Sequence, residues 1–352
     1  MQVTVMKSFS RRTFLRLCGK ACLALGLGSV LPKSVAAAAT PPALRVIASR
    51  TLPLTDGERL RAIIFSDSQC GGDYDVWART FAAAFDRHGV PDVFTVTGDL
   101  VDCGASAWHW DGWQAAMDAR ASASTFVPVM GNHECYNEEW LCYVPHDYLA
   151  RFSGVPANGS TRFPAYYYSF DCGPAHFIVL NTQWGELDDL LPGILPEQLA
   201  WMQKDFAAQK KQGAKPWNIV LMHKDVLAYD EPQPDGTTMG FSDAGRALMK
   251  SFDVGGIDLV LTGHMHAYRN RGRIKNFSAS DGGPVYVMNG RAGNEYYFVP
   301  QDRFDRVAAP DDHVETYLTL NVTREALTLE AWATDGTRLD AFTLHKKDGN
   351  DA

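Results

Sequence analysis

Five segments of this 352-residue chain share one pattern, a short continuous apolar run that ends at a polar residue. A continuous apolar run of this length is typical of a strand that is buried on both faces. In open α/β sheets the carboxyl ends of such strands border the ligand crevice, so we expect the five endings to converge on one site. The runs begin at residues 61, 92, 126, 218 and 258, and they end at Asp67, Asp99, Asn132–His133, His223 and His264–His266.

Between these runs, the hydrophobic spacing changes to that of amphipathic helices. Apolar residues recur at helical spacing from Val76 to Phe85, and Pro196 stands in the first turn of a second predicted helix. Ser242 is a suitable N-cap for a third helix, from Asp243 to Phe252. The alternation of strand and helix patterns predicts an α/β protein.

After Arg269 the pattern returns to strands, and a hairpin turn joins the last two of them. We expect these strands, from about residue 284 onward, to complete a second sheet. The predicted fold is therefore α/β, with two mixed β-sheets packed as a sandwich and flanked by helices. The predicted C-terminal strands are 284–289, 315–322, 326–334 and 338–345.

The side chains at the five strand ends are carboxylate, amide and imidazole groups, with no thiolate among them. Oxygen and nitrogen donors of this kind suit Mn, Fe, Zn or Mg. The set is larger than one ion needs, because zinc is usually four-coordinate and a catalytic ion keeps one position open. Two ions that share a bridging carboxylate fit the set better, which comprises Asp67, Asp99, Asn132, His133, His223, His264 and His266.

The order of these motifs resembles the calcineurin-like metallophosphoesterase superfamily, and the segment from Gly263 to Arg269 is most similar to its purple-acid-phosphatase branch. The resemblance covers essentially the whole mature chain and implies a four-layer metallophosphoesterase fold. The matching motifs are Asp67-x-x, Gly98-Asp99-x-x-Asp102, Gly131-Asn132-His133-Glu134, a lone His223, and Gly263-His264-x-His266.

The resemblance implies two metal ions, Fe, Mn or Zn, bridged by Asp99 and by a hydroxide that attacks a phosphate ester. Two ions activate water and stabilise both the attacking and the leaving oxygen of an in-line displacement. By the same resemblance, Asp67 and His266 hold one ion, and Asn132, His223 and His264 hold the other.

The resemblance also implies catalytic and substrate-contacting residues. His133 would act as the general acid, and the Asp102 carboxylate would lie against its imidazole and fix its tautomer. Asn132 and His133 would contact the substrate. From the residues alone, Arg269, the preferred candidate, and Asn294 either touch the substrate phosphate or merely order loops. The metal-bound tyrosine of purple acid phosphatases is missing here, so the purple colour is not expected.

Gln69 is a departure from the family pattern, because many members have a histidine two residues after the first aspartate. As a neutral donor, Gln69 either binds the first ion through its carbonyl oxygen or hydrogen-bonds a water molecule on that ion. The third reading is an ordinary loop residue. A site that depends on an amide would bind its metal more weakly.

The N-terminal segment has the features of a twin-arginine export signal. Ser10 to Arg16 contains the arginine pair, and an apolar stretch near 21–31 and an alanine run at 35–39 follow it. We expect residues 1–39 to be removed and residues 40–352 to form a single catalytic domain. The apolar stretch is shorter than the about 20 residues that span a bilayer. The expected location is therefore periplasmic or extracellular, with the twin-arginine machinery as a partner and no stable membrane anchor.

Composition and charge limit the partners. The chain is 46% hydrophobic and 21% charged, which is ordinary for a globular domain. Without residues 1–39 it has 27 basic and 41 acidic residues, or a net charge of about −14. A body this acidic does not favour nucleic acid, whereas a small phosphorylated substrate remains compatible.

The remaining features leave alternatives open. Five cysteines survive processing, so that either Cys70–Cys103 or Cys135–Cys142 bridges form or the thiols stay free and buried. The aromatic connection from Cys135 to about Tyr166, with the segment 108–113, is either a substrate-selecting cap or local packing. A metal-binding protein without turnover and a hydrolase of non-phosphate esters are the rival functions.

Overall fold

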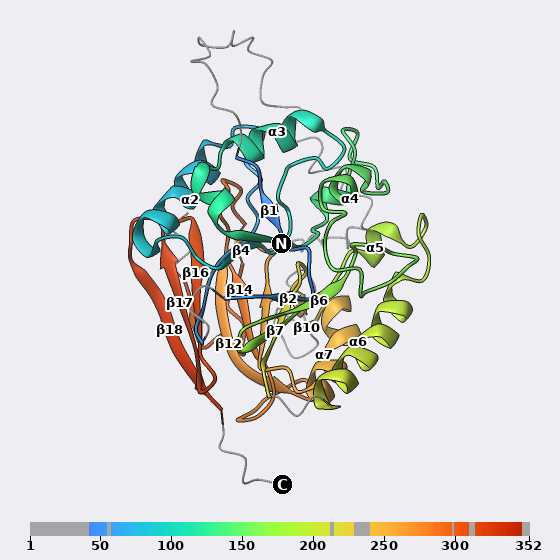
Figure 1. Cartoon of the computed structure of the whole chain (residues 1–352), viewed down its shortest axis with the longest axis vertical. Helices are drawn as coiled ribbons and strands as arrows, with labels where there is room; N and C mark the ends of the chain where they lie inside the picture. Colours follow the sequence, from blue (N-terminus) through green and yellow to red (C-terminus); the bar gives the residue numbers. More distant parts are fainter. Residues whose placement is uncertain are drawn as a thin grey trace, which may run out of the picture. The chain divides into compact units, whose positions relative to one another are not determined.

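Two large mixed sheets, with helices outside them, form the protein (Figure 1). The structure is a computed structural model, and it describes residues 42–54, 58–211, 215–228, 240–297, 299–309 and 314–346. The predicted α/β sandwich is confirmed. The proposed export signal and its cleavage site, at residues 1–39, lie outside the described residues.

The first sheet has seven strands in the order β1-β5-β4-β3-β16-β17-β18. Strands β1, β5, β4 and β3 are parallel to one another, and β16, β17 and β18 continue from β3 in antiparallel order. The strands are β1 (Arg45–Val46), β3 (Leu60–Phe65), β4 (Val93–Val96), β5 (Thr125–Pro128), β16 (Thr316–Val322), β17 (Ala326–Ala333) and β18 (Arg338–His345).

The second sheet has nine strands, in the order β13-β12-β14-β11-β8-β7-β6-β2 with β15 beside β12. Its centre, β14, β11, β8 and β7, is parallel. The strands are β2 (Thr51–Leu52), β6 (Tyr168–Cys172), β7 (Ala175–Val179), β8 (Trp217–Leu221), β11 (Leu259–Thr262), β12 (Tyr268–Lys275), β13 (Ser278–Ala279), β14 (Val285–Asn289) and β15 (Val307–Ala308). A separate antiparallel pair consists of β9 (Leu227–Ala228) and β10 (Gly240–Phe241).

The expectation that all strands from about residue 284 complete the second sheet is wrong for the last three strands. β14 does belong to the nine-stranded sheet, but β16, β17 and β18 extend the seven-stranded one. β16 pairs with β3, its residue Leu318 lying opposite Ile64. Hydrophobic alternation identifies a strand but carries no information about which distant strand it will pair with.

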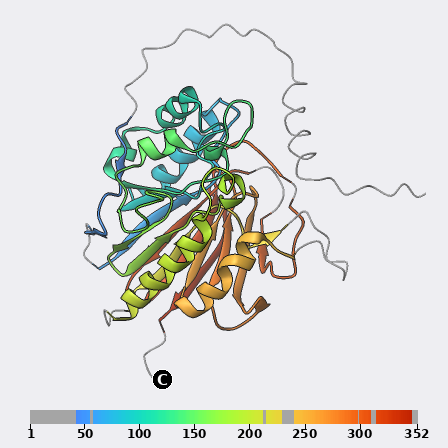
Figure 2. The ribbon, with the colours of Figure 1, turned by 90° about the vertical axis from the view of Figure 1, so that its right-hand side faces the viewer.

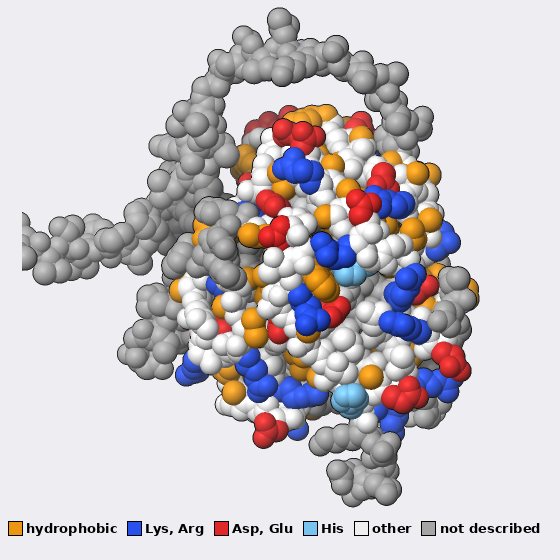
Figure 3. All heavy atoms as spheres, turned by 90° about the vertical axis from the view of Figure 1, so that its left-hand side faces the viewer, with side chains coloured by type: hydrophobic (Ala, Val, Ile, Leu, Met, Phe, Trp, Pro, Cys, Tyr) orange, Lys and Arg blue, Asp and Glu red, His pale blue; other side chains and the backbone are white. Residues whose placement is uncertain are grey.

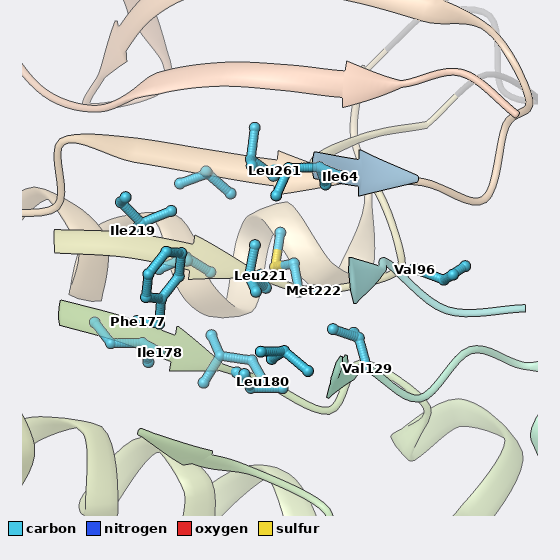
Figure 4. Close-up of a cluster of buried hydrophobic side chains, with 14 of the residues drawn as sticks. Ile64, Val96, Val129, Phe177, Ile178, Leu180, Ile219, Leu221, Met222 and Leu261 are labelled. Atoms are coloured by element: carbon cyan, nitrogen blue, oxygen red, sulfur yellow. The ribbon is translucent and has the colours of Figure 1, made fainter. Parts of the chain in front are cut away.

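The core between the sheets explains why the predicted runs are apolar throughout. Figure 4 shows side chains from β3, β7, β8 and β11, together with residues at the ends of β4 and β5, packed against one another. All four residues of β4, of β5 and of β11 are buried. β17, by contrast, alternates buried and partly exposed positions, as one-sided packing requires.

Helices cover the outer faces of both sheets. On α2, Phe81 stacks against Phe65 of β3, so α2 lies on the seven-stranded sheet. Helices α6 and α7 run side by side in Figure 2 and cover the nine-stranded sheet. The helices are α2 (Asp75–His88), α3 (Ala107–Ala115), α4 (His146–Arg151), α5 (Trp184–Leu187), α6 (Ile194–Lys211), α7 (Asp243–Gly255) and the 3-10 turns η1 (Ala119–Ala123) and η2 (His133–Cys135).

The local predictions agree with these elements. The Ser242 hydroxyl accepts a hydrogen bond from the Gly245 N–H at 3.0 Å and caps α7, as predicted. The predicted hairpin joins β17 to β18, with Gly336 at φ +95° in its turn. The helix around Pro196 begins two residues earlier than that proline, at Ile194, so Pro196 lies in its first turn.

A buried network around His176 lies near the amino end of β7, away from the carboxyl ends of the strands. His176 Nδ1 is 2.6 Å from the Asp171 carboxylate, and Nε2 is 2.8 Å from the Asp205 carboxylate. Burial lowers the pKa of His176, but the two carboxylates outweigh burial and raise it. The imidazolium therefore ties β6, β7 and α6 together, which is a structural role.

The surface beside β17 and β18 intersperses acidic and basic side chains with single hydrophobic ones (Figure 3). β18 is the edge strand of its sheet, and most of its residues are partly or fully exposed. Charged residues on an exposed edge oppose pairing with another chain. Across the described part of the chain, no helix is long and apolar enough to cross a membrane.

Candidate metal centre

The carboxyl ends of strands from both sheets bring the predicted donors together. Asp67, Asp99 and His133 follow β3, β4 and β5 in one sheet, while His223 and His264 follow β8 and β11 in the other. Across the two sheets, His223 Nε2 lies 3.0 Å from Asp99 Oδ2, and His266 Nε2 lies 3.3 Å from Asp67 Oδ1. The structure therefore confirms that the side chains at the strand ends lie close together.

One cluster of donors surrounds His223. Its Nε2 lies 3.0 Å from Asp99 Oδ2, 3.0 Å from Asn132 Oδ1 and 3.2 Å from His264 Nδ1. Ligand atoms of Asp99, His223 and His264 all lie within 4.8 Å of one another, which is close enough for one cation to contact all three. Because most of these atoms present lone pairs, a cation suits the centre of the cluster better than another hydrogen bond does.

A second cluster contains Asp67, Asp99 and His266, whose ligand atoms again lie within 4.8 Å of one another. His266 Nε2 is 3.3 Å from Asp67 Oδ1. Both carboxylate oxygens of Asp67 also accept from the His264 N–H, at 3.1 and 3.0 Å. Asp99 belongs to both clusters, so its two oxygens could serve two cations.

Gln69 adjoins the second cluster through His266 and is completely buried. Its amide nitrogen is 3.2 Å from His266 Nε2, and its carbonyl oxygen has no hydrogen-bond partner among the described residues. A half turn of the amide exchanges these two atoms and directs the carbonyl oxygen to His266 Nε2. A buried amide oxygen without a partner fits a cation in this cluster.

Four candidate ligands have a left-handed backbone conformation, which non-glycine residues rarely adopt. Such a conformation costs about 1–3 kcal/mol per residue and persists where the surroundings fix it, often at functional sites. Close packing fixes it here, since a Cβ on Gly131 would lie 2.1 Å from Asp99 Oδ1. The four residues are Asp67 (φ 50°), Asp99 (φ 53°), His264 (φ 75°) and His266 (φ 55°).

Backbone carbonyl groups orient three of the imidazoles. The Nδ1 atoms of His133, His223 and His266 lie 2.8, 2.9 and 3.0 Å from the carbonyl oxygens of Asp102, Thr97 and Glu295. A carbonyl oxygen only accepts, so each Nδ1 carries the proton. Nε2 of each ring is then directed to the site, an arrangement typical of metal-binding histidines.

The pKa shifts of Asp99 and His223 indicate that the site favours positive charge. Burial raises the pKa of Asp99, but His223 and His133 outweigh burial and lower it. Burial lowers the pKa of His223, but Asp99 outweighs burial and raises it to about 9. A proton on the His223 imidazole thus supplies positive charge next to the Asp99 carboxylate. A bound metal cation would displace that proton.

The predicted contact between the Asp102 carboxylate and His133 is wrong. The carboxylate instead accepts from the N–H groups of Cys70, Gly71 and Gly72, at 3.2, 2.6 and 3.2 Å, and from the Tyr74 hydroxyl at 3.0 Å. Only the backbone carbonyl of Asp102 contacts the imidazole. The side chain therefore shapes the loop after Gln69, and the main chain fixes the tautomer of His133.

Of the two roles expected for Arg269, the structure favours the ordering of loops over a contact with substrate phosphate. Arg269 is 2% exposed, and its guanidinium donates to the carbonyl oxygens of Tyr268 and Val299 and lies 3.4 Å from the Asp305 carboxylate. Arg271 and Asp225 form a neighbouring buried ion pair at 2.9 Å. The contacts of these two arginines support β12.

Glu134 is a residue of the site that the pattern of strand endings does not single out. Its carboxylate, completely buried, accepts from four backbone N–H groups, those of Asp99, Leu100, Val101 and Gly131, at 3.0, 2.8, 3.3 and 2.6 Å. It therefore joins the loop after β4 to the loop after β5. Its position directly after His133 in the motif was the available signal.

Two exposed aromatic rings stand beside the site. Trp140, 42% exposed, packs edge-on against His133 with ring centroids 5.5 Å apart. Tyr297, 41% exposed, stacks on His266 at 4.3 Å and donates to Glu295 at 3.2 Å. Of the segments considered as a cap, the connection after Cys135 thus reaches the site through Trp140.

The cations beside the ligands already have partners. Lys224 follows His223 and contacts both carboxylate oxygens of Glu186, at 2.6 and 2.8 Å. Arg291 donates to the carbonyl oxygens of Asn294 and Glu295, at 3.4 and 2.7 Å.

All five cysteines in the described ranges are free thiols, so neither the Cys70–Cys103 nor the Cys135–Cys142 bridge is formed. Cys70, Cys103, Cys135 and Cys172 are buried, as the alternative expectation had it, whereas Cys142 is exposed. Burial raises the pKa of the Cys70 thiol to about 12. A neutral thiol is a poor metal ligand, which agrees with a site built from oxygen and nitrogen.

Known proteins share these motifs and this fold. The calcineurin-like phosphoesterase family matches residues 60–268. Purple acid phosphatases 15 and 23 of Arabidopsis thaliana are 29% and 30% identical, each over 53% of this chain and over 32% and 38% of their own lengths. The chain thus spans about a third of these relatives. Purple acid phosphatase PPD1 of yellow lupin (Lupinus luteus) superposes with a TM-score of 0.58 at 22% identity, over 82% of this chain and 54% of the lupin chain.

Proposed function

The chain belongs to the calcineurin-like phosphoesterase family, and we propose that it hydrolyses phosphate esters at two cations that share Asp99. The observation that carries the proposal is the membership of Asp99 in both clusters of ligand atoms. The similarity to purple acid phosphatases supports the same reaction. Small phosphorylated molecules, rather than nucleic acid, suit an acidic protein body.

The residues divide into two sets of ligands around Asp99. One cation would be held by Asp67, His266 and, after a turn of its amide, Gln69. The other would be held by Asn132, His223 and His264. The oxygen and nitrogen donors suit Fe, Mn or Zn. Two such ions, when bound, activate a water molecule near neutral pH and neutralise charge on the phosphoryl oxygens.

His133 is the proposed general acid. Its Nδ1 is occupied by the Asp102 carbonyl, so a transferable proton can sit only on Nε2, which lies 3.9 Å from Asp99 Oδ2 on the metal side. The departing alcohol oxygen becomes negatively charged as the P–O bond breaks, and Nε2 would protonate it. An imidazole has a suitable proton affinity near neutral pH. Asn132, one of the proposed metal ligands, would also contact the phosphoryl group.

Export before function is a further part of the proposal. The arginine pair and apolar stretch in residues 10–31 support passage through the twin-arginine route to the periplasm or the exterior. That route carries folded proteins, so the metal would be loaded in the cytoplasm, where Fe or Mn competes better with Zn. Metal analysis of protein isolated from its native compartment tests this, and zinc alone would contradict it.

The reaction is tested with a chromogenic phosphate monoester, the matching diester, and matching carboxyl and sulfate esters. The protein, reconstituted separately with Fe, Mn, Zn or Mg, should release product only from a phosphate ester and only with metal. His133→Ala should keep its metal and lose about 10²–10⁴-fold in kcat, the usual contribution of a general acid. The preferred phosphate ester then assigns the protein as a monoesterase or a diesterase.

Two results would support rival functions. Turnover of a carboxyl or sulfate ester in preference to phosphate would make the protein a different metal-dependent hydrolase. Absence of turnover with both cations bound, together with unchanged metal content in His133→Ala, would identify a metal-binding protein that does not catalyse hydrolysis. Neither result is expected, because the imidazole of His133 is held in the orientation that an acid needs.

A further inference from the structure

Two aromatic side chains remain exposed beside residues of the metal centre. Trp140 and Tyr297 pack on His133 and His266 through one side of their rings, yet 42% and 41% of their surfaces stay open to solvent. Burying a large aromatic ring is favourable, so packing alone would cover them. Each ring therefore has a surface left for a further contact.

The backbone of the turn that contains Trp140 is strained. Trp140 has φ +59°, a conformation that bulky residues rarely adopt. The Asn137 side chain holds the turn by accepting from the N–H groups of Glu139 and Leu141, at 3.1 and 2.8 Å. The Trp140 N–H donates to the Asn137 carbonyl at 2.9 Å. A conformation fixed against its own cost is more common at binding sites than in surface turns.

Tyr297 is fixed by a different set of contacts. Its hydroxyl donates to the Glu295 carboxylate, and the Glu295 carbonyl accepts from His266. The phenol ring lies nearly parallel to the imidazole, at 27°. Because the backbone carbonyl of Glu295 orients the His266 imidazole, this support remains when the Tyr297 ring is removed.

The charged side chains next to the candidate ligands disfavour a leaving group with a second phosphate. Lys224 is already paired with Glu186, and Arg291 is bound to two carbonyl groups. The carboxylate of Glu295 lies next to Tyr297. A second anionic group on the substrate would meet this carboxylate and two cations that already have partners.

From these contacts we propose that Trp140 and Tyr297 select phosphate esters whose leaving group is a planar, uncharged aromatic ring. His133 would deliver its proton to the leaving oxygen, so the group attached to that oxygen departs next to Trp140, the ring packed on His133. A planar group can stack on an indole or phenol ring irrespective of its hydrogen-bonding pattern. This inference rests on the proposed phosphoesterase function and adds its substrate class.

The test compares 2-naphthyl phosphate with glycerol 2-phosphate, and uses the ratio of kcat/KM in each variant to that in the wild type. This ratio cancels the different intrinsic reactivities of the two esters. Trp140→Ala and Tyr297→Ala should each lower kcat/KM for the naphthyl ester about tenfold, the upper range for an aromatic contact, and change the glycerol ester less than about twofold. Trp140→Phe should restore most of the loss.

Two further measurements separate selection from support of the site. Metal content should remain unchanged in both alanine variants. The affinity for a non-hydrolysable naphthyl phosphonate, measured by calorimetry on the metal-loaded protein, should fall by the same factor as kcat/KM. Trp332→Ala is the matched control, because Trp332 lies on β17 against His88 and Arg87. This control should change neither ratio.

The outcomes distinguish this inference from the function on which it rests. Equal losses of kcat/KM on both esters would show that the rings merely hold His133 and His266. Unchanged kcat/KM on both esters would show that the rings contact neither substrate. Either result overturns the aromatic selection while phosphate release by the wild type keeps the proposed function. If the wild type releases phosphate from neither ester, the proposed function fails and this inference fails with it.

Discussion

Replacing Asp102 by asparagine separates the two roles of this residue, because the side chain changes and the backbone carbonyl stays. The carboxylate oxygens accept from three backbone N–H groups and the Tyr74 hydroxyl. An asparagine can keep one accepting oxygen, but its NH2 group would face donors at the other position. The loop that follows Gln69 would lose part of its support.

The size of the effect follows from the pKa of Asp102. Burial raises that pKa, but the hydrogen bonds from His109, Gly71 and Cys70 outweigh burial and lower it from 3.8 to about 2. A difference of about two pKa units corresponds to about 2–3 kcal/mol, since each unit is worth 1.36 kcal/mol. The side chain is only 9% exposed, so solvent screens this energy little.

Asp102→Asn should therefore lower the free energy of unfolding by about 2 kcal/mol at pH 7, measured by urea denaturation of the metal-free protein. A lowered folded pKa stabilises above the unfolded value, so the difference from wild type should be complete above about pH 4 and vanish as pH falls toward about 2. Asp73→Asn, an exposed carboxylate in the same loop, is the control and should change stability by less than about 0.5 kcal/mol.

The same variant tests the assignment of His133. Because the carbonyl that accepts from His133 is retained, kcat of the metal-saturated variant should fall less than about fivefold, below the about 10–100-fold expected for loss of a carboxylate partner. A variant with unchanged stability and a kcat reduced by that larger factor would refute the reasoning. That result would instead support the contact between the Asp102 carboxylate and the His133 imidazole that the sequence resemblance implied.

Three other predictions follow from the contacts of the site and of the core. Glu134→Gln, which places an NH2 group among four backbone donors, should lower the unfolding free energy by about 2–4 kcal/mol and reduce metal content, as calorimetry and elemental analysis would show. Gly131→Ala should lose metal because its Cβ would lie 2.1 Å from Asp99 Oδ1, whereas Gly154→Ala, with nothing within 4 Å, should not. The raised pKa of His176 should stabilise fully below about pH 6.5 and less as pH rises through the folded value, so the stability difference between wild type and His176→Asn should shrink at alkaline pH.

The cluster of candidate ligands could be predicted from the sequence because a single physical rule accounts for its positions. Parallel strands buried on both faces are apolar throughout, so a polar residue at the end of each is conspicuous. The carboxyl ends of those strands meet at the same edge, which brings Asp67, Asp99 and His223 together from segments far apart in the chain. Neither the register nor the pairing order was needed for this prediction.

The errors arose where the outcome depends on which atom of a residue makes a contact, or on a pairing between distant strands. The motif places Asp102 near His133, but only coordinates distinguish its carbonyl from its carboxylate. Arg269 follows the last ligand motif, yet β12 turns it into the interior, where Asp305 meets it. Likewise, nothing in 316–345 signals that these strands join β3 rather than β14.

Some supporting residues left no readable signal. Glu295 orients His266 through its backbone carbonyl, which every residue type possesses. Tyr297 is one aromatic residue among many, and only its contact with His266 sets it apart. Trp140 lies in the aromatic connection that was considered as a cap, but only its contact with His133 distinguishes it from its neighbours there.

The central claim, that Asp99 joins two cations in one hydrolytic site, is tested most directly by the metal-to-protein ratio of wild type and Asp99→Asn, measured on the same samples used for phosphate-ester hydrolysis. We predict two ions and turnover in the wild type, and in Asp99→Asn fewer than two ions with loss of turnover. Two tightly bound ions and undiminished turnover in Asp99→Asn would contradict the shared-carboxylate centre.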